Sequence, residues 1–148
     1  MEMLEEAVKE ALEGVKNKDG GPFGAIIINT EGKIVARGHN RVLRDKDPTA
    51  HAEIMAIREA CKKLDTKDLT GCVLYTTCEP CPMCLSAIIW ANIKTIYYGS
   101  TRKDAKEIGF KDDDIYEFIK GNNDLLKEIK LENKSCKDLF INYDGERY

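Results

Sequence analysis

Apolar residues recur at helical spacing near the start of the chain. They lie every three or four positions, at Leu4, Val8, Leu12 and Val15, with Ala7 and Ala11 beside them. This spacing predicts an amphipathic helix with that apolar face inward. The Asn, Asp, Gly and Pro residues of 17–22 then end the helix.

Two segments rich in Ile and Val follow, at residues 23–29 and 33–39. Thr30, Glu31 and Gly32 separate them, and a glycine there suits a tight turn, so the pattern predicts an antiparallel hairpin. After a charged loop at 44–48, Thr49 is placed to cap a helix that runs to about residue 64. The inward positions of that helix are Ile54, Ile57 and Ala60 or Cys61.

The middle of the chain alternates strand, helix and strand. Residues 72–77 and 95–99 have strand composition, and the mostly apolar helix 81–91 lies between them. This order predicts a parallel crossover, with helices on both faces of the sheet. Asp112, Asp113 and Asp114 then predict the start of a short helix to residue 120, and residues 135–141 predict a last one, whereas 125–131 fit either element.

Length and charge limit the classes of protein. A chain of 148 residues, 43% hydrophobic and 33% charged, predicts one domain over residues 1–148. The net charge of -3 differs from the basic balance typical of nucleic-acid binders. The first residues are not those of a secretory signal and no apolar run could span a bilayer, so we expect a cytoplasmic protein without a membrane segment.

The six cysteines indicate metal or redox chemistry, because thiols stay reduced in the cytoplasm. Cys78, Cys81 and Cys84 cluster within seven residues, whereas the other three are isolated. Cys81 and Cys84 are three positions apart at a helix start, where free N–H groups stabilise thiolates. Together with His51 they form a donor set that suits a catalytic Zn²⁺ ion with one position left for water.

Glu53 follows His51 by two positions and is the candidate acid and base beside that water. Other interpretations remain open. His51 and Glu53 also suit an ordinary helix start, and the Cys-x-x-Cys pair also suits a structural zinc site or a thioredoxin-like redox centre. Cys78 is a candidate fourth ligand, which would close the site to water.

His51-Ala52-Glu53 followed by Pro80-Cys81-Pro82-Met83-Cys84 matches the signature of zinc deaminases. Over about residues 20–121 the sequence resembles the cytidine deaminase-like superfamily. That resemblance implies a three-layer α/β/α fold, with helices on both faces of a mixed five-stranded sheet. Within the superfamily the sequence is most similar to bacterial guanine deaminases, through residues 20–25, 47–53, 78–84 and 104–110.

The resemblance implies hydrolytic deamination of guanine to xanthine and ammonia, with one zinc ion per subunit and Glu53 moving the protons. It further implies that the Asn40 amide and the Ala52 N–H hold the base and that Asp112 reads the purine edge. Phe23 and Trp90 are candidates to stack on the purine.

The resemblance also implies a homodimer that exchanges the C-terminal segments 135–148, so that Tyr148 reaches the partner's active site. The alternative substrates are guanosine, cytosine or an adenosine in tRNA, and the acidic balance argues against tRNA. An alternative without turnover is a zinc-stabilised binding domain.

Overall fold

Helices precede, separate and follow the strands along the chain, and the computed structural model describes residues 2–148. The described helices are α1 (Glu2–Lys16), α2 (Val42–Asp45), α3 (Ala52–Leu64), α4 (Pro82–Trp90), α5 (Arg102–Glu107), α6 (Asp112–Ile119) and α7 (Lys134–Ile141). The described strands are β1 (Gly24–Ile28), β2 (Ile34–His39), β3 (Val73–Cys78) and β4 (Thr95–Ser100). The predicted hairpin and the strand, helix and strand that follow are confirmed.

The strands form one mixed sheet in the order β2-β1-β3-β4. β1 is antiparallel to both β2 and β3, whereas β3 and β4 are parallel and joined through α4. The expected count of five strands is wrong for residues 2–148, where the sheet has four. Residues 125–131, which fit either element, form neither, and their leucines and isoleucine are exposed.

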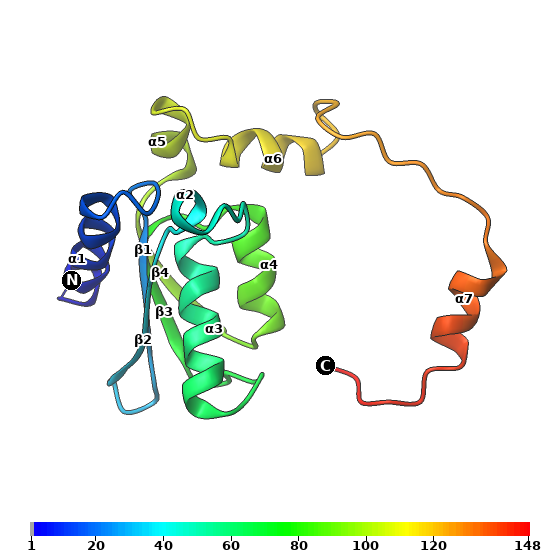
Figure 1. Cartoon of the computed structure of the whole chain (residues 1–148), viewed down its shortest axis with the longest axis horizontal. Coiled ribbons are helices and arrows are strands. Elements are labelled where there is room, and N and C mark those ends of the chain that lie inside the picture. Colours follow the sequence, from blue (N-terminus) through cyan, green and yellow to red (C-terminus); the bar gives the residue numbers. More distant parts are fainter. Residues whose placement is uncertain (1) are drawn as a thin grey trace.

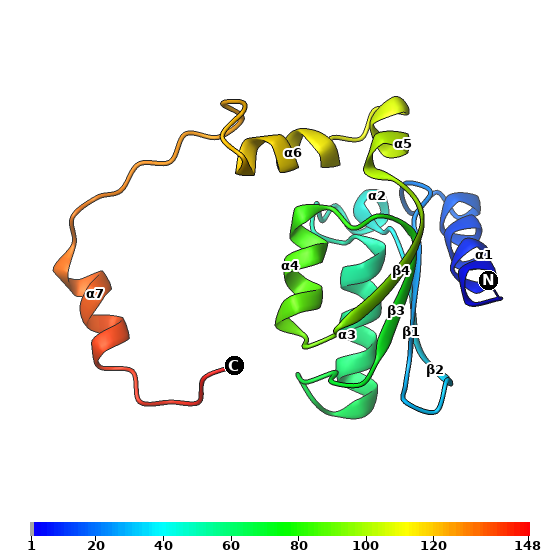
Figure 2. The same ribbon diagram turned by 180° about the vertical axis from the view of Figure 1, so that it is seen from behind.

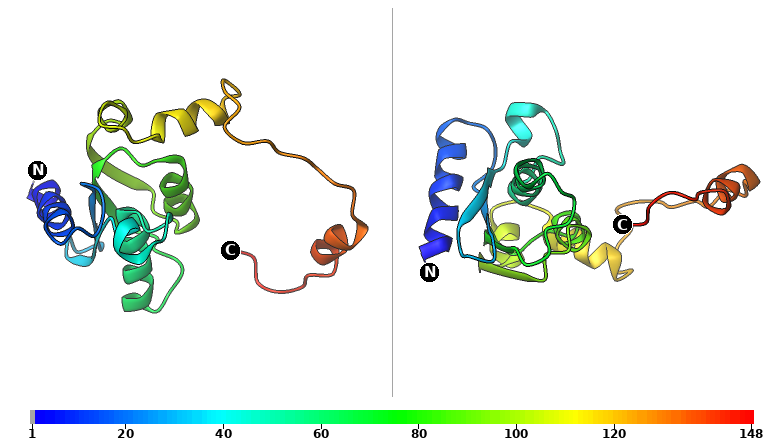
Figure 3. Two further views of the ribbon diagram at one scale, coloured as in Figure 1. Left: turned by 45° about the horizontal axis from the view of Figure 1, so that its top comes forward. Right: turned by 90° about the horizontal axis from the view of Figure 1, so that it is seen from below.

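Helices cover both faces of the sheet. Figures 1 and 2 show α1 on one face and α3 with α4 on the other, which is the expected three-layer α/β/α arrangement of a cytidine deaminase-like fold. The same layers are visible end-on in the right panel of Figure 3. α2, α5 and α6 lie around the end of the sheet where β3 and β4 finish.

α1 packs on the sheet through its small residues. Ala7, Ala11 and Gly14 are buried, whereas Leu12, on the face expected to be inward, is 62% exposed. A Cβ atom on Gly24 of β1 would lie 2.1 Å from the Ala7 carbonyl oxygen, so the helix backbone lies almost against the strand. Only small side chains fit at such a contact, which is why the two alanines of the predicted face are buried and Leu12 is not.

The start of α3 lies equally close to β2. A Cβ atom on Gly38 would be 2.4 Å from the Ala52 carbonyl oxygen, so no side chain separates the strand from the first turn of the helix. The predicted cap is also wrong. The Thr49 hydroxyl donates to Asp47 Oδ1 at 2.7 Å, and His51 is the residue that precedes the helix, in extended backbone conformation. The sheet thus fixes the position of His51.

The C-terminal segment departs from the rest of the fold. Figures 1 and 3 show the chain beyond α6 running outward to α7 and then returning toward α4. Its apolar side chains are exposed, namely Leu125, Leu126, Ile129, Leu131, Leu139, Phe140, Ile141, Tyr143 and Tyr148. In residues 2–148, no helix has the length and the apolar content that a membrane span needs.

Candidate active site

The three predicted zinc ligands converge at the N-terminal ends of α3 and α4. His51 and Cys81 each occupy the position just before a helix, and Cys84 lies in the first turn of α4. His51 Nδ1 is 3.5 Å from the sulfur of Cys81 and 3.5 Å from that of Cys84. All three donor atoms lie within 4.8 Å of one another, which is close enough for one ion to contact all of them.

The chemistry of these donors fits zinc. Both thiols are buried, and the hydrogen bonds that the Cys81 sulfur receives from Cys84 and from His51 lower the pKa of Cys81. The same contact with Cys81 raises the pKa of Cys84, because the two sulfur atoms share one proton. A divalent cation favours two thiolates in place of that shared proton. An imidazole and two thiolates are also the ligands of a catalytic zinc site that keeps a fourth position.

Glu53 lies beside these donors and is almost entirely buried, with 5% of its surface exposed. The Thr76 hydroxyl, from β3, donates to Glu53 Oε1 at 2.6 Å and fixes the direction of the carboxylate. Burial raises the pKa of Glu53, because the charged form loses its hydration. A carboxylate with a raised pKa is a stronger base, as a residue that takes a proton from water must be.

A cavity of about 580 Å³ opens onto this group. His51, Glu53 and Cys81 line one part of it, and the predicted substrate residues Phe23, Asn40 and Asp112 line other parts. The structure thus brings together the predicted zinc ligands, the candidate acid and base Glu53, and three of the residues expected to contact the substrate. The rest of its wall is mostly apolar, which suits a flat aromatic base.

Asn40 is oriented by its neighbours. Its side-chain oxygen accepts the Val42 N–H at 3.1 Å, which leaves the amide nitrogen as the group able to donate to a ligand. Only glycine leaves room for the amide at position 20, because a Cβ atom on Gly20 would lie 2.1 Å from Asn40 Oδ1. Asn40 is buried, so this amide is a fixed donor at the cavity.

Asp112 and Phe23 form parts of the cavity wall away from the donors. Asp112 begins α6 and is partly buried, and this burial raises the pKa of its carboxyl group. The Phe23 ring meets that of Phe110 edge to face, with centroids 4.9 Å apart. Phe110 also lines the cavity, and its place two positions before Asp112 was a signal that the sequence analysis did not use.

The expected role of Trp90 at the cavity is not supported. Trp90 is the last residue of α4, 66% exposed, and does not line the cavity. At about 1.5 Å per residue, nine residues separate it from Cys81 by more than 13 Å along the helix. It contacts Tyr148 instead, with ring centroids 6.0 Å apart, so Tyr148 also lies away from the cavity of its own chain.

Two further predictions from the sequence concern Ala52 and Cys78. Ala52 is the first residue of α3, where a backbone N–H has no partner within the helix, so the Ala52 N–H is available to a ligand.

Cys78 is not one of the three grouped donors. Its thiol donates instead to the Thr101 carbonyl at 3.6 Å. Burial raises the pKa of Cys78 to about 12, which keeps it a neutral thiol.

Thr76 was missed by the sequence analysis. In the strand pattern it alternates with partly exposed neighbours and shares its buried face with Leu74 and Cys78. A hydroxyl on the inward face of a strand that leads directly to the Cys-x-x-Cys pair is the signal that could have identified it.

Comparison with known proteins agrees with this site. Residues 1–100 match the cytidine and deoxycytidylate deaminase zinc-binding region. The guanine deaminase of Bacillus subtilis (strain 168) is 53% identical over 116 residues, which are 78% of this chain and 74% of the relative. The tRNA-specific adenosine deaminase of Aquifex aeolicus (strain VF5) is 46% identical over 100 residues, 68% of this chain and 65% of the relative.

Structural comparison extends the similarity to the C-terminal segment. The crystal structure of Bacillus subtilis guanine deaminase superposes with a TM-score of 0.85 and 43% identity, over 99% of this chain and 96% of that one. The matched region holds the His51 and Glu53 motif and the Cys81 and Cys84 pair. The chain therefore belongs to the cytidine and deoxycytidylate deaminase family of zinc-binding domains.

Proposed function

We propose that this protein hydrolyses guanine to xanthine and ammonia. The observation that carries the proposal is the similarity to Bacillus subtilis guanine deaminase, which extends in structure over 99% of the chain. It therefore includes the residues after position 100, among them Asp112, which lines the cavity. The whole of residues 1–148 is then a single deaminase domain with an extended C-terminal segment.

His51, Cys81 and Cys84 would hold one zinc ion, which when bound supplies a water molecule acidic enough to act as the nucleophile at neutral pH. As the oxygen of the attacking water bonds to the carbon that bears the amine, the Glu53 carboxylate would take a proton from that water and pass it to the adjacent ring nitrogen. Glu53 would then carry the proton of the newly added hydroxyl group to the amine. The carbon–nitrogen bond then breaks, ammonia leaves and the water oxygen becomes the new carbonyl of xanthine.

The other cavity residues orient the base. The Asn40 amide nitrogen and the Ala52 N–H donate to acceptor atoms of the purine, since both are donors at or beside the cavity. The Asp112 carboxylate accepts from the purine edge that carries N–H groups, and Phe23 packs on the ring face. Guanine offers both kinds of edge, so these groups are complementary to it.

The test of substrate is a panel assay with the purified zinc-loaded protein. Guanine, guanosine, cytosine, adenine and an adenosine-bearing tRNA stem-loop are compared by the initial rate of ammonia release, with xanthine followed in the same samples. We expect guanine to be the preferred substrate. Turnover of the stem-loop without xanthine from guanine would instead favour the activity named for the Aquifex aeolicus relative.

We further propose a homodimer in which the segments 135–148 are exchanged and Tyr148 reaches the partner's site. Its support is the run of exposed apolar side chains in this segment, among them Leu139, Phe140 and Ile141, which find no core within residues 2–148. Figure 1 shows how far α7 lies from the rest of the fold. Burying these side chains against a second copy would stabilise the segment by about 25 cal/mol per Å² of apolar surface.

Sedimentation velocity tests the dimer. We expect the full chain to sediment at twice the mass of one chain, and a variant that ends at residue 132 to sediment as a monomer. A full chain that stays monomeric at every concentration would contradict the dimer.

The cytoplasm is the compartment that we propose, because its reducing conditions keep Cys81 and Cys84 available as thiolate ligands.

A further inference from the structure

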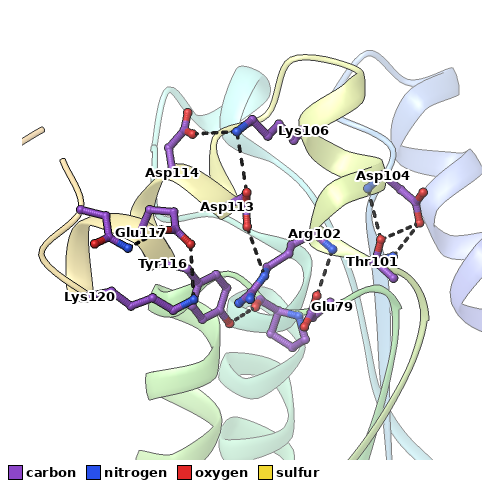
Figure 4. A network of polar contacts seen from close by, with 12 residues as sticks. Glu79, Thr101, Arg102, Asp104, Lys106, Asp113, Asp114, Tyr116, Glu117 and Lys120 are labelled. Carbon is purple, nitrogen blue, oxygen red and sulfur yellow. Dashed lines mark hydrogen bonds and ion pairs between the residues drawn. The ribbon is translucent and has the colours of Figure 1, made fainter.

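The segment that leads into Cys81 is fastened to the end of β4 through Glu79. The Glu79 N–H donates to the Ser100 carbonyl at 2.8 Å, and Glu79 Oε2 accepts the Arg102 N–H at 3.0 Å. Figure 4 shows Glu79 beside Arg102, at the start of α5. The position of Cys81 therefore depends on contacts made where β4 passes into α5.

Tyr116 reaches the same segment from α6. Its hydroxyl donates to the Pro80 carbonyl at 2.6 Å, and Pro80 is fully buried directly before Cys81. Burial raises the pKa of Tyr116, so the hydroxyl keeps its proton and remains a donor at neutral pH. The Arg102 guanidinium lies over the ring, 4.2 Å from its centroid (Figure 4).

Arg102 makes a second contact with α6. Its Nε is 3.2 Å from Asp113 Oδ1, and both side chains are partly buried, whereas the pairs that Lys106 forms with Asp113 and Asp114 lie nearer the solvent. None of the residues of α6 is buried, so apolar packing holds this helix only weakly. The contacts of Tyr116 and Arg102 are thus the specific attachments of α6 to the segment before Cys81.

Asp112 and Tyr116 are four positions apart in α6 and therefore lie on the same side of the helix. A helix anchored at Tyr116 has its Asp112 carboxylate directed by that anchor, and Asp112 lines the cavity. We propose that Tyr116, supported by Arg102, is a positioning residue that holds Asp112 against the substrate and so sets the affinity for guanine. The role assigned to Tyr116 rests on the proposed deamination of guanine.

Tyr116→Phe removes the hydroxyl and keeps the ring under Arg102. We expect KM for guanine to rise about tenfold, the effect of one lost hydrogen bond, while kcat changes less than about twofold and the zinc content stays the same. Tyr97→Phe is the matched control, because Tyr97 is half exposed on β4 and its hydroxyl bonds to no other described residue. It should leave both constants unchanged.

A double variant that also carries Asp112→Asn distinguishes a positioning role of Tyr116 from a general loss of structure. We expect Asp112→Asn alone to raise KM, and the double variant with Tyr116→Phe to raise it no further, because both changes remove the same contact. Hydrogen exchange of the α6 amides gives a readout that needs no substrate. Exchange at 112–119 should become faster in Tyr116→Phe and not in Tyr97→Phe.

The possible failures are distinguishable. Additive effects of the Tyr116 and Asp112 substitutions on KM, or unchanged exchange of α6, would overturn the positioning role while wild-type protein still forms xanthine. Wild-type protein that forms no xanthine would overturn the proposed function, and the positioning role of Tyr116 toward guanine with it.

Discussion

Replacing Glu53 with glutamine will abolish most turnover while the protein keeps its zinc. The amide has nearly the shape of the carboxylate and can still accept the Thr76 hydroxyl, but it cannot take a proton from water. Proton transfer by a placed side chain typically contributes about 10²- to 10⁴-fold to a rate, so we expect kcat to fall by that factor. Steady-state assay of xanthine formation, together with zinc analysis of the same samples, measures both quantities.

The control for this substitution is Glu59→Gln. Glu59 lies on the same helix as Glu53, away from the cavity, and accepts the Arg37 N–H at 2.9 Å, which glutamine can also do. It should retain wild-type kcat and zinc content. Loss of zinc from Glu53→Gln would contradict the division of roles, because it would place Glu53 among the ligands.

Replacing a zinc ligand, unlike Glu53→Gln, will remove the metal as well as the activity. We expect His51→Ala and Cys84→Ala to lower the zinc content to less than about a tenth of one ion per chain, since a catalytic site has three protein ligands and no spare donor. Activity should fall with the metal. The thermal midpoint should also drop toward that of chelator-treated wild-type protein, because an ion that binds only the folded state stabilises it.

Cys61→Ala is the matched control for the ligand variants. Cys61 is a free, partly buried thiol on α3 that is not grouped with the metal donors. It should bind one zinc ion per chain and lose little activity. Full zinc content in His51→Ala or Cys84→Ala would contradict the proposed ligand set.

The metal-binding residues and Glu53 could be predicted because they lie close together in the sequence as two short motifs. His51 and Glu53 are two positions apart, and Cys81 and Cys84 are three apart, so each pair is recognisable within one turn of chain. That the two pairs meet came from their match to the signature of zinc deaminases, and the structure confirms the meeting at 3.5 Å. Asp112 was placed by resemblance alone, and it does line the cavity.

The errors concern contacts between elements distant in the chain. Which residues of the α1 face are buried could not be predicted, because the close approach of Gly24 selects the alanines over Leu12 and hydrophobic periodicity carries no information on that distance. Trp90 was assigned to the cavity by residue type, without the length of α4 that separates it from Cys81. The link from Tyr116 to Pro80 spans 36 positions, and no local pattern predicts it.

The most direct measurement is xanthine and ammonia formation from guanine as a function of the zinc bound per chain. Metal-depleted protein is reloaded in steps, and the zinc content and both products are quantified at each step. The proposed function predicts equal amounts of xanthine and ammonia, with a rate that rises in proportion to zinc and levels off at about one ion per chain. Protein with one bound zinc per chain that releases no xanthine from guanine would contradict it.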